Sequence, residues 1–331
     1  MRNPLIIFFT LVLLTKVTLA QDPQFSQFYA NPLYMNPAFA GSTGNTRIVA
    51  SARNQYTALN KNFNTQMVSV DMSISQIGGG LGLMATNDVA GDGNLSSVSY
   101  SGIYSYQFHV NKQLIIRTGI QGTYVQRSYD FSLLRFGDQI DPRYGFVYPT
   151  KEAVGFQKIG YANFGAGFLA YTDIFFGGFS IQNIAEPNIS FYSATQSSSS
   201  SQYTLPRRYT AHAGLNIFLT HQRDDQERLL ISPNVIYMQQ RDFTQLNLGF
   251  YVKKQALTGG LWFRQTSQNS DAAIVLIGLK FPKFRAGYSY DITVSGARTA
   301  TMGSHEISLA YEIAYPRQQK RIFKPLMCPV F

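Results

Sequence analysis

The sequence predicts an all-β protein, a transmembrane antiparallel β-barrel of about 14 strands with an N-terminal plug or collar segment. Three observations predict this fold. Many stretches alternate between apolar and polar residues with a period of two, these stretches run to about ten residues or more, and the connections between them are alternately short and long. A tilted strand needs about 9–11 residues to cross a bilayer, whereas strands of soluble sheets have about 5–6.

The alternation is clearest in a hairpin near the middle of the first half of the chain. In residues 98–108, aromatic and aliphatic residues fall on one parity, polar residues fall on the other, and only Ile103 departs from the pattern. Residues 114–124 repeat the alternation after a short polar break. Such apolar faces meet in the core of a soluble sandwich, but face lipid in an outer-membrane barrel. Strand length and the aromatic residues near strand ends favour lipid.

The predicted strands follow one another along most of the chain, and their number is even, as closure with the tail on the starting side requires. The predicted strands are residues 47–58, 66–75, 80–87, 98–108, 114–124, 161–172, 174–183, 208–220, 229–239, 243–252, 256–266, 272–281, 284–294 and 304–315. Residues 128–160 and 184–207 are too long for hairpin turns and are predicted to be outer loops. If the barrel starts on the inner side, nearly every inner turn is shorter than its outer neighbours.

The first segment, residues 1–20, is interpreted as a signal peptide. Arg2 supplies its positive end, residues 5–14 its apolar middle, and Thr18 to Ala20 its small-x-small cleavage site. No other stretch approaches the roughly 20 apolar residues that a membrane-spanning helix needs. We therefore expect an exported protein that crosses the outer membrane as a multi-pass barrel.

Residues 21–45 precede the predicted barrel of residues 46–315 and do not alternate. Two Asn-Pro pairs in this segment are turn signals, because proline disfavours helix at the residue before it. The segment also carries several aromatic side chains that need burial, and the lumen is the available place in a barrel. We expect a plug or collar; a leader packed loosely against the rim is the alternative.

Composition restricts the partners of the chain. The formal net charge is +10, and removal of Arg2 and Lys16 with the signal peptide lowers it to +8 (10 − 2). No cluster of lysine and arginine follows one predicted strand, so we expect outer-membrane lipid and no nucleic acid as a partner. The single cysteine, Cys328, excludes an internal disulfide framework.

The C-terminal segment, residues 316–331, is a basic tail predicted to lie in the periplasm. Its notable residues are Arg317, Lys320, Arg321, Lys324 and Cys328. Two interpretations remain open: an extension of the last strand that contacts lipid phosphates, or a docking peptide for periplasmic machinery.

No motif predicts a catalytic, cofactor or metal site. His305 and Glu306 begin a zinc-protease pattern, but Leu309 stands where the second histidine is needed. The charged residues of the strands instead fall mostly on the lumen parity, which predicts ion pairs that brace the barrel or bind a plug. The candidate plug and lumen contacts are Phe25, Phe28, Tyr29, Asn31, Asn36, Arg53, Asp71, Arg117, Arg264, Arg285, Asp291 and Glu306.

Several stretches together resemble the PorP/SprF proteins of the Bacteroidetes. The matching stretches are residues 24–28 (QFSQF), 31–33 (NPL), 36–38 (NPA), 40–41 (AG), 53–55 (RNQ), 87–91 (NDVAG), 136–141 (FGDQID), 304–308 (SHEIS) and 328–331 (CPVF). The resemblance spans essentially the whole mature chain. One departure is Tyr56, where the family pattern has Trp; both residues suit a membrane interface.

The resemblance implies an outer-membrane barrel of the type IX secretion system and, in gliding bacteria, an association with surface adhesins. It implies a partner of the secretion machinery or of one secreted substrate, without enzymatic activity or cofactor. The first hypothesis is therefore a plugged barrel that supports export or anchoring of a large surface protein. The second is a passive channel or transporter for small solutes, and a hydrolase built on a lumen histidine is a distant third.

Overall fold

The structure is a computed structural model in which the following residues are described: 22–57, 63–91, 95–111, 113–130, 134, 136–151, 156–191, 204–219, 229–267, 271–294 and 302–314. The predicted signal peptide, residues 1–20, and the basic tail with Arg317, Lys320, Arg321, Lys324 and Cys328 lie outside these ranges. Within the described ranges, no helix is long and apolar enough to span a membrane.

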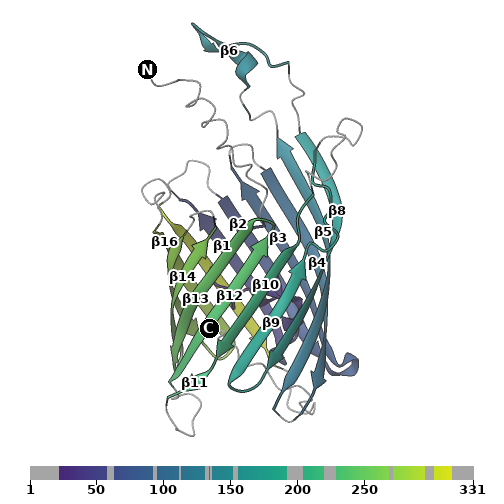
Figure 1. The fold of residues 1–331 in the computed structure, drawn as a ribbon, viewed down its shortest axis with the longest axis vertical. Helices are drawn as coiled ribbons and strands as arrows, with labels where there is room; N and C mark the ends of the chain where they lie inside the picture. The colour runs from purple at the N-terminus through teal and green to yellow at the C-terminus, as the bar shows by residue number, and fades with distance from the viewer. Residues whose placement is uncertain are drawn as a thin grey trace, which may run out of the picture.

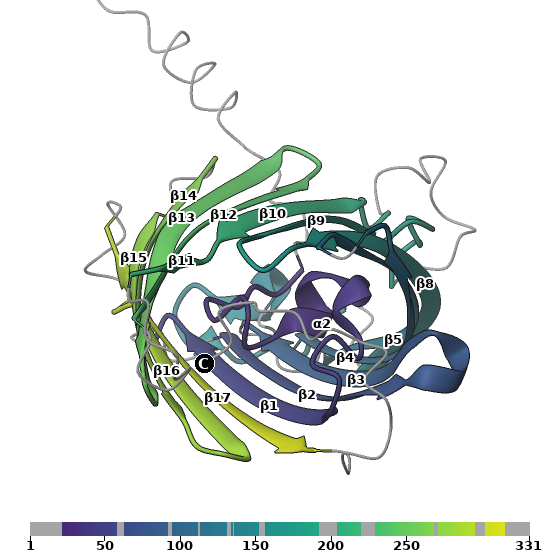
Figure 2. The same cartoon turned by 90° about the horizontal axis from the view of Figure 1, so that it is seen from below.

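The chain forms a closed antiparallel β-barrel (Figures 1 and 2). The ring contains fourteen strands when β10 and β11, which both pair with β12, are counted as one interrupted strand. The first and last strands, β1 and β17, pair over ten residue pairs from Thr46 with Ile313 to Gln55 with Ser304, which closes the ring. The all-β barrel predicted from the sequence is thus confirmed. The strands are β1 (Thr46–Gln55), β2 (Phe63–Ile74), β3 (Gly79–Ala90), β4 (Leu95–His109), β5 (Ile115–Asp130), β8 (Phe156–Tyr171), β9 (Phe175–Gln182), β10 (Arg208–Leu215), β11 (Ile217–Phe218), β12 (Leu230–Gln240), β13 (Phe243–Lys254), β14 (Leu257–Thr266), β15 (Ala272–Lys280), β16 (Phe284–Thr293) and β17 (Ser304–Ile313).

The alternation in the sequence separates a lipid face from a lumen face. In β4, Ser101 and Ser105 are buried, whereas Tyr100 is 59% exposed and Phe108 is 47% exposed. The exception to the pattern, Ile103, is 3% exposed and joins an apolar cluster inside the barrel. Apolar side chains therefore cover the outside of the ring, as a lipid environment requires.

The two ends of the barrel differ in their connections. The connections of residues 131–155 and 183–207 lie at one end, and those of residues 75–78, 172–174 and 281–283 lie at the other. Outer-membrane barrels place their long loops outside, so the first end is the outer one. The sorting is incomplete, because the inner connection of residues 219–229 is longer than the outer one of residues 241–242.

Part of the longest loop has structure of its own. Strands β6 (Ile140–Asp141) and β7 (Gly145–Phe146) form a two-stranded sheet after a short 3-10 helix, η4 (Gly137–Gln139). This unit projects beyond the outer end of the ring (Figure 1).

Residues 22–44 lie inside the ring (Figure 2); we call them the N-terminal segment. The segment contains a single helical turn, α2 (Pro32–Met35), and a 3-10 turn, η1 (Pro37–Phe39). Each turn starts with a proline, whose fixed φ suits the first position of a helix. Asn36 separates the two turns, and its Oδ1 accepts a hydrogen bond from the Ala38 backbone N–H at 2.9 Å.

The N-terminal segment runs from the outer end of the barrel to the inner end. Asp22 contacts Gln240, the last residue of β12 at the outer end, and Gly41 contacts Asp71 near the inner end of β2. The segment therefore begins at the outer end, opposite to the inner end at which the predicted barrel starts. The first strand, β1, does begin on the inner side.

The interior of the barrel is packed like the core of a soluble protein. Aromatic and aliphatic side chains of the N-terminal segment form one buried cluster with lumen-facing residues of the strands, among them Met67, Ile236 and Trp262. Barrels of about eight strands fill their lumen with side chains of the wall alone, but a ring of fourteen strands encloses a wider lumen. Here the segment supplies much of the filling.

Candidate functional site

Four charged residues from four strands converge on Ser26 near the outer end of the lumen. Arg53 pairs with Asp291 at 2.7 Å and with Glu306 at 3.1 Å, and Arg264 pairs with Asp291 at 3.0 Å. All four are at most 5% exposed. Buried charges are tolerated only when they are paired and hydrogen-bonded, so this outer cluster requires its full set of partners.

The N-terminal segment completes the outer cluster. The Ser26 hydroxyl donates to Asp291 at 2.6 Å and accepts from Arg53 at 2.5 Å and from Arg264 at 2.8 Å. Glu306 accepts from the Ser26 N–H at 2.6 Å and from the Gln27 N–H at 3.2 Å. Charged groups of the wall therefore satisfy backbone groups of the segment, which have no strand to pair with.

Two asparagines fix the middle of the N-terminal segment. Asn31 donates to Glu306 at 3.2 Å and accepts from the Ser51 hydroxyl at 2.5 Å. The Asn36 amide donates to the carbonyl oxygens of Phe168 at 3.0 Å and Phe179 at 3.3 Å. The turn residues that the sequence singled out thus also bind the wall.

A second set of charged residues contacts the segment near the inner end. The Arg117 guanidinium donates to the carbonyl oxygen of Ala38 at 3.1 Å and to that of Ala40. Asp71 accepts from the Gly41 N–H at 2.8 Å and forms a two-contact pair with Arg47 at 2.8 and 3.0 Å. The segment is therefore anchored by charged groups at both ends of the lumen.

Two glycines make room for the N-terminal segment. A Cβ on Gly119 would meet the backbone of Pro37 and Ala38, and a Cβ on Gly167 would meet the side chain of Asn36. Both glycines lie on lumen-facing positions of adjacent strands, β5 and β8, which pair at these residues. The absence of a side chain at these two glycines therefore lets the segment approach the wall closely, and charged residues of the wall bind its backbone.

Aromatic side chains of the segment pack into the lumen wall. Phe28 lies 4.9 Å from Trp262 between ring centroids, and Tyr29 contacts Phe176 edge to face at 5.6 Å. Phe25 is 4% exposed and packs within the segment against Tyr34 at 5.1 Å. Fully burying one such side chain stabilises by about 1.5–3 kcal/mol.

Eleven of the twelve candidate lumen residues lie in the N-terminal segment or contact it directly or through the packed core. Arg285 differs, because it pairs with Glu312 at 2.5 Å and so bridges the neighbouring strands β16 and β17 near the inner end. Two residues of these contacts were not predicted from the sequence: Ser26, the centre of the outer cluster, and Arg47, the partner of Asp71. Arg47 shares the parity of Arg53 in β1, so alternation could have indicated it; Ser26 carried no such signal.

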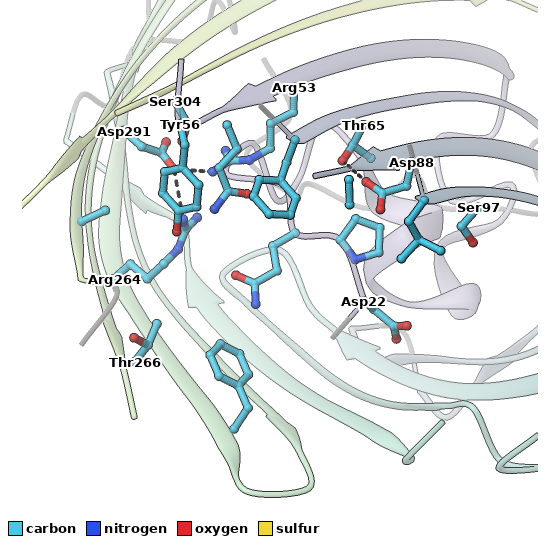
Figure 3. A pocket seen from close by; sticks show the side chains of 18 of the residues that line it. Asp22, Arg53, Tyr56, Thr65, Asp88, Ser97, Arg264, Thr266, Asp291 and Ser304 are labelled. Atoms are coloured by element: carbon cyan, nitrogen blue, oxygen red, sulfur yellow. Dashed lines mark hydrogen bonds and ion pairs between the residues drawn. The ribbon is translucent and has the colours of Figure 1, made fainter. Parts of the chain in front are cut away.

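Above the outer cluster, the lumen opens into a cavity of about 430 Å³, which we call the outer vestibule (Figure 3). Asp22 and the outer cluster residues Arg53, Arg264 and Asp291 line this cavity, and the outer ends of most strands form its wall. Tyr56, expected at the membrane interface, lines this cavity and adopts a left-handed backbone with φ 62°.

Two carboxylates shape the projecting outer loop. Hydrogen bonds, above all from the Lys151 N–H, hold the pKa of Asp138 below its ordinary value. Those from the Arg143 N–H and the Tyr148 hydroxyl do the same for the pKa of Asp141. Across the described residues, no group of three or more histidine, cysteine or carboxylate side chains could hold a metal ion.

The solved structures to which this chain is similar have low sequence identity to it. No curated protein matches the chain by sequence. A FadL homologue of Pseudomonas aeruginosa is 13% identical, with 87% of this chain and 96% of that chain covered and a TM-score of 0.45. The CymD monoaromatic hydrocarbon channel is 11% identical, with 87% and 94% covered and a TM-score of 0.44. The barrel assignment itself rests on the strand pairing.

The sequence also matches a family model, described as type IX secretion system membrane protein PorP/SprF, over residues 17–311. This range contains every described strand except the last residues of β17. The chain therefore belongs to the PorP/SprF family of type IX secretion system membrane proteins and is an outer-membrane β-barrel.

Proposed function

We propose that the protein is a plugged, non-enzymatic barrel that supports the export or surface anchoring of a large secreted protein of the adhesin type. Its family membership supports a role beside the type IX secretion machinery. The N-terminal segment acts as the plug in this proposal, and the long outer loops contact the secreted protein.

One observation carries the proposal: the N-terminal segment occupies the lumen from Asp22 at the outer end to Gly41 at the inner end. Hydrogen bonds from charged and polar residues of the wall, together with aromatic packing, attach the segment between these residues. A barrel of this kind offers surfaces for proteins at its two ends but does not need an open path between them. The basic tail, residues 316–331, is proposed as the periplasmic contact.

Deletion of the gene tests the export role. We expect at least one large surface protein to disappear from the cell surface and accumulate inside the cell or be degraded. A complementing copy with an intact outer cluster should restore it, and a complementing copy without residues 22–44 should be impaired. An unchanged surface proteome after deletion would contradict the proposal.

The second function, a passive channel for small solutes, predicts a different electrical behaviour. A plugged barrel should be nearly silent in planar bilayers, and removal of residues 22–44 should produce large, steady conductance, because a 14-strand ring encloses a wide lumen. Large conductance from the intact protein would favour the channel instead.

A further inference from the structure

The outer vestibule carries more acidic than basic groups. Its lining includes four aspartates, Asp22, Asp88, Asp271 and Asp291, and three arginines, Arg53, Arg127 and Arg264. The arginines are engaged: two belong to the outer cluster, and Arg127 hydrogen-bonds the Tyr161 phenol. Two of the aspartates are engaged as well, because Asp291 pairs with both outer-cluster arginines and Asp22 pairs with Arg208 at 3.4 Å. Within the described part of the chain Asp88 and Asp271 form no ion pair, so they are the acidic groups that the vestibule offers to a ligand.

Several carboxylate oxygens of the vestibule are free to accept. Asp88 uses one oxygen for the Thr65 hydroxyl at 2.6 Å, and Asp271 uses one for the Thr266 N–H at 2.8 Å. A cationic group in the vestibule would supply a donor to the second oxygen of Asp88 and to that of Asp271.

The position of the carboxylates favours a single elongated ligand. Asp88 lies close enough to Asp22 for their charges to interact, and both line the same side of the vestibule (Figure 3). Because like charges repel, a cation placed between them is stabilised by both. Asp271 stands on the opposite part of the ring, at the start of β15.

Aromatic rings stand beside the carboxylates. Tyr56 and Phe63 pack edge to face at 5.9 Å, and Tyr161 and Phe243 complete the aromatic part of the lining. Aromatic faces bind ammonium and guanidinium groups as well as apolar side chains. A cavity of about 430 Å³ fits a few residues of polypeptide and falls within the range of ligand sites, about 300–1,000 Å³.

We propose that the outer vestibule binds a short, extended stretch of the exported protein, in which a lysine or arginine is flanked by aromatic or aliphatic residues. This inference rests on the proposed function for the identity of the partner. The chemistry of the ligand follows from the vestibule alone: carboxylate acceptors and aromatic rings in its lining, and an opening toward the cell exterior.

Calorimetry with purified full-length protein in detergent tests the inference. The probes are acetyl-Tyr-Lys-Tyr-amide, the matched acetyl-Tyr-Glu-Tyr-amide, and spermidine as a free polyamine. We expect the lysine peptide to bind, with weaker affinity at high salt, and the glutamate peptide not to bind. Asp88→Asn and Asp271→Asn should each weaken binding by about tenfold, because each removes one partly screened charge contact. Both asparagines keep the existing hydrogen bond, so the fold is preserved.

Asp242→Asn is the matched control, because Asp242 is exposed on the outer turn between β12 and β13 and does not line the vestibule. Absence of binding by the lysine peptide would overturn the proposal, as would equal binding of the glutamate peptide or an equal loss with the control. Spermidine binding as tightly as the peptide would overturn the assignment to polypeptide. Peptide binding combined with an unchanged surface proteome after gene deletion would overturn only the export role.

Discussion

Glu306→Gln tests whether the outer cluster attaches the N-terminal segment. The carboxylate accepts four hydrogen bonds: one oxygen takes the Ser26 N–H and the Arg53 guanidinium, and the other takes the Gln27 N–H and the Asn31 amide. Glutamine has nearly the same shape but replaces one of these oxygens by an amino group. Whichever way the amide points, two donors then face another donor.

The free-energy cost of Glu306→Gln follows from the number of donors that lose their acceptor. A buried donor without an acceptor costs about 1–3 kcal/mol, so two cost about 2–6 kcal/mol. Loss of the negative charge beside Arg53 adds to this cost, although Asp291 still pairs with that arginine. States in which the start of the segment has left the lumen wall should therefore become at least about thirty times more populated, since 1.4 kcal/mol is a factor of ten.

Hydrogen exchange at the Ser26 and Gln27 amides measures this population directly, and the frequency of openings in planar bilayers provides an independent measurement. Glu186→Gln is the control, because Glu186 pairs with Arg207 at 3.4 Å with both side chains more than 40% exposed. Such a surface pair contributes about 0–1 kcal/mol. If Glu306→Gln exchanges and conducts like the control, the outer cluster does not hold the segment.

Three further predictions concern the same contacts. Phe28→Ala should destabilise the barrel by about 3–5 kcal/mol and shift the fluorescence of Trp262, the single tryptophan of the chain, to longer wavelength, as measured by denaturant titration. Gly119→Ala should increase bilayer conductance because its Cβ would meet the segment, whereas Gly122→Ala on the same strand has open space and should not. The pKa of Asp138 is lowered in the folded loop, so its contribution to loop stability is present above the unfolded value of 3.8 and is lost as pH falls through the folded pKa; hydrogen exchange of the loop should rise only at such acid pH.

Alternation of residue types made most of the fold predictable. Each strand carries its own period of two, so Arg53, Arg264 and Asp291 could be assigned to the lumen from parity alone. Their convergence could not be predicted, because it depends on strands far apart in sequence and on the register between them. The direction of the N-terminal segment was also beyond prediction, since a segment without regular structure has no parity. Ser26 is small and polar, and only the structure reveals that two arginines and two carboxylates surround it.

The route of the N-terminal segment has a consequence for how the molecule is assembled. Ser26 bonds to Glu306, 280 residues later in the chain, so the earliest residues reach their final partners only when the last strand exists. Such distant contacts form slowly, because closing a long loop costs entropy before it yields any contact. In addition, when β1 and β17 pair, the closed ring encircles the segment. The order of assembly is therefore constrained: either the N-terminal segment lies inside the sheet before β1 and β17 pair, or it enters the lumen after the ring has closed.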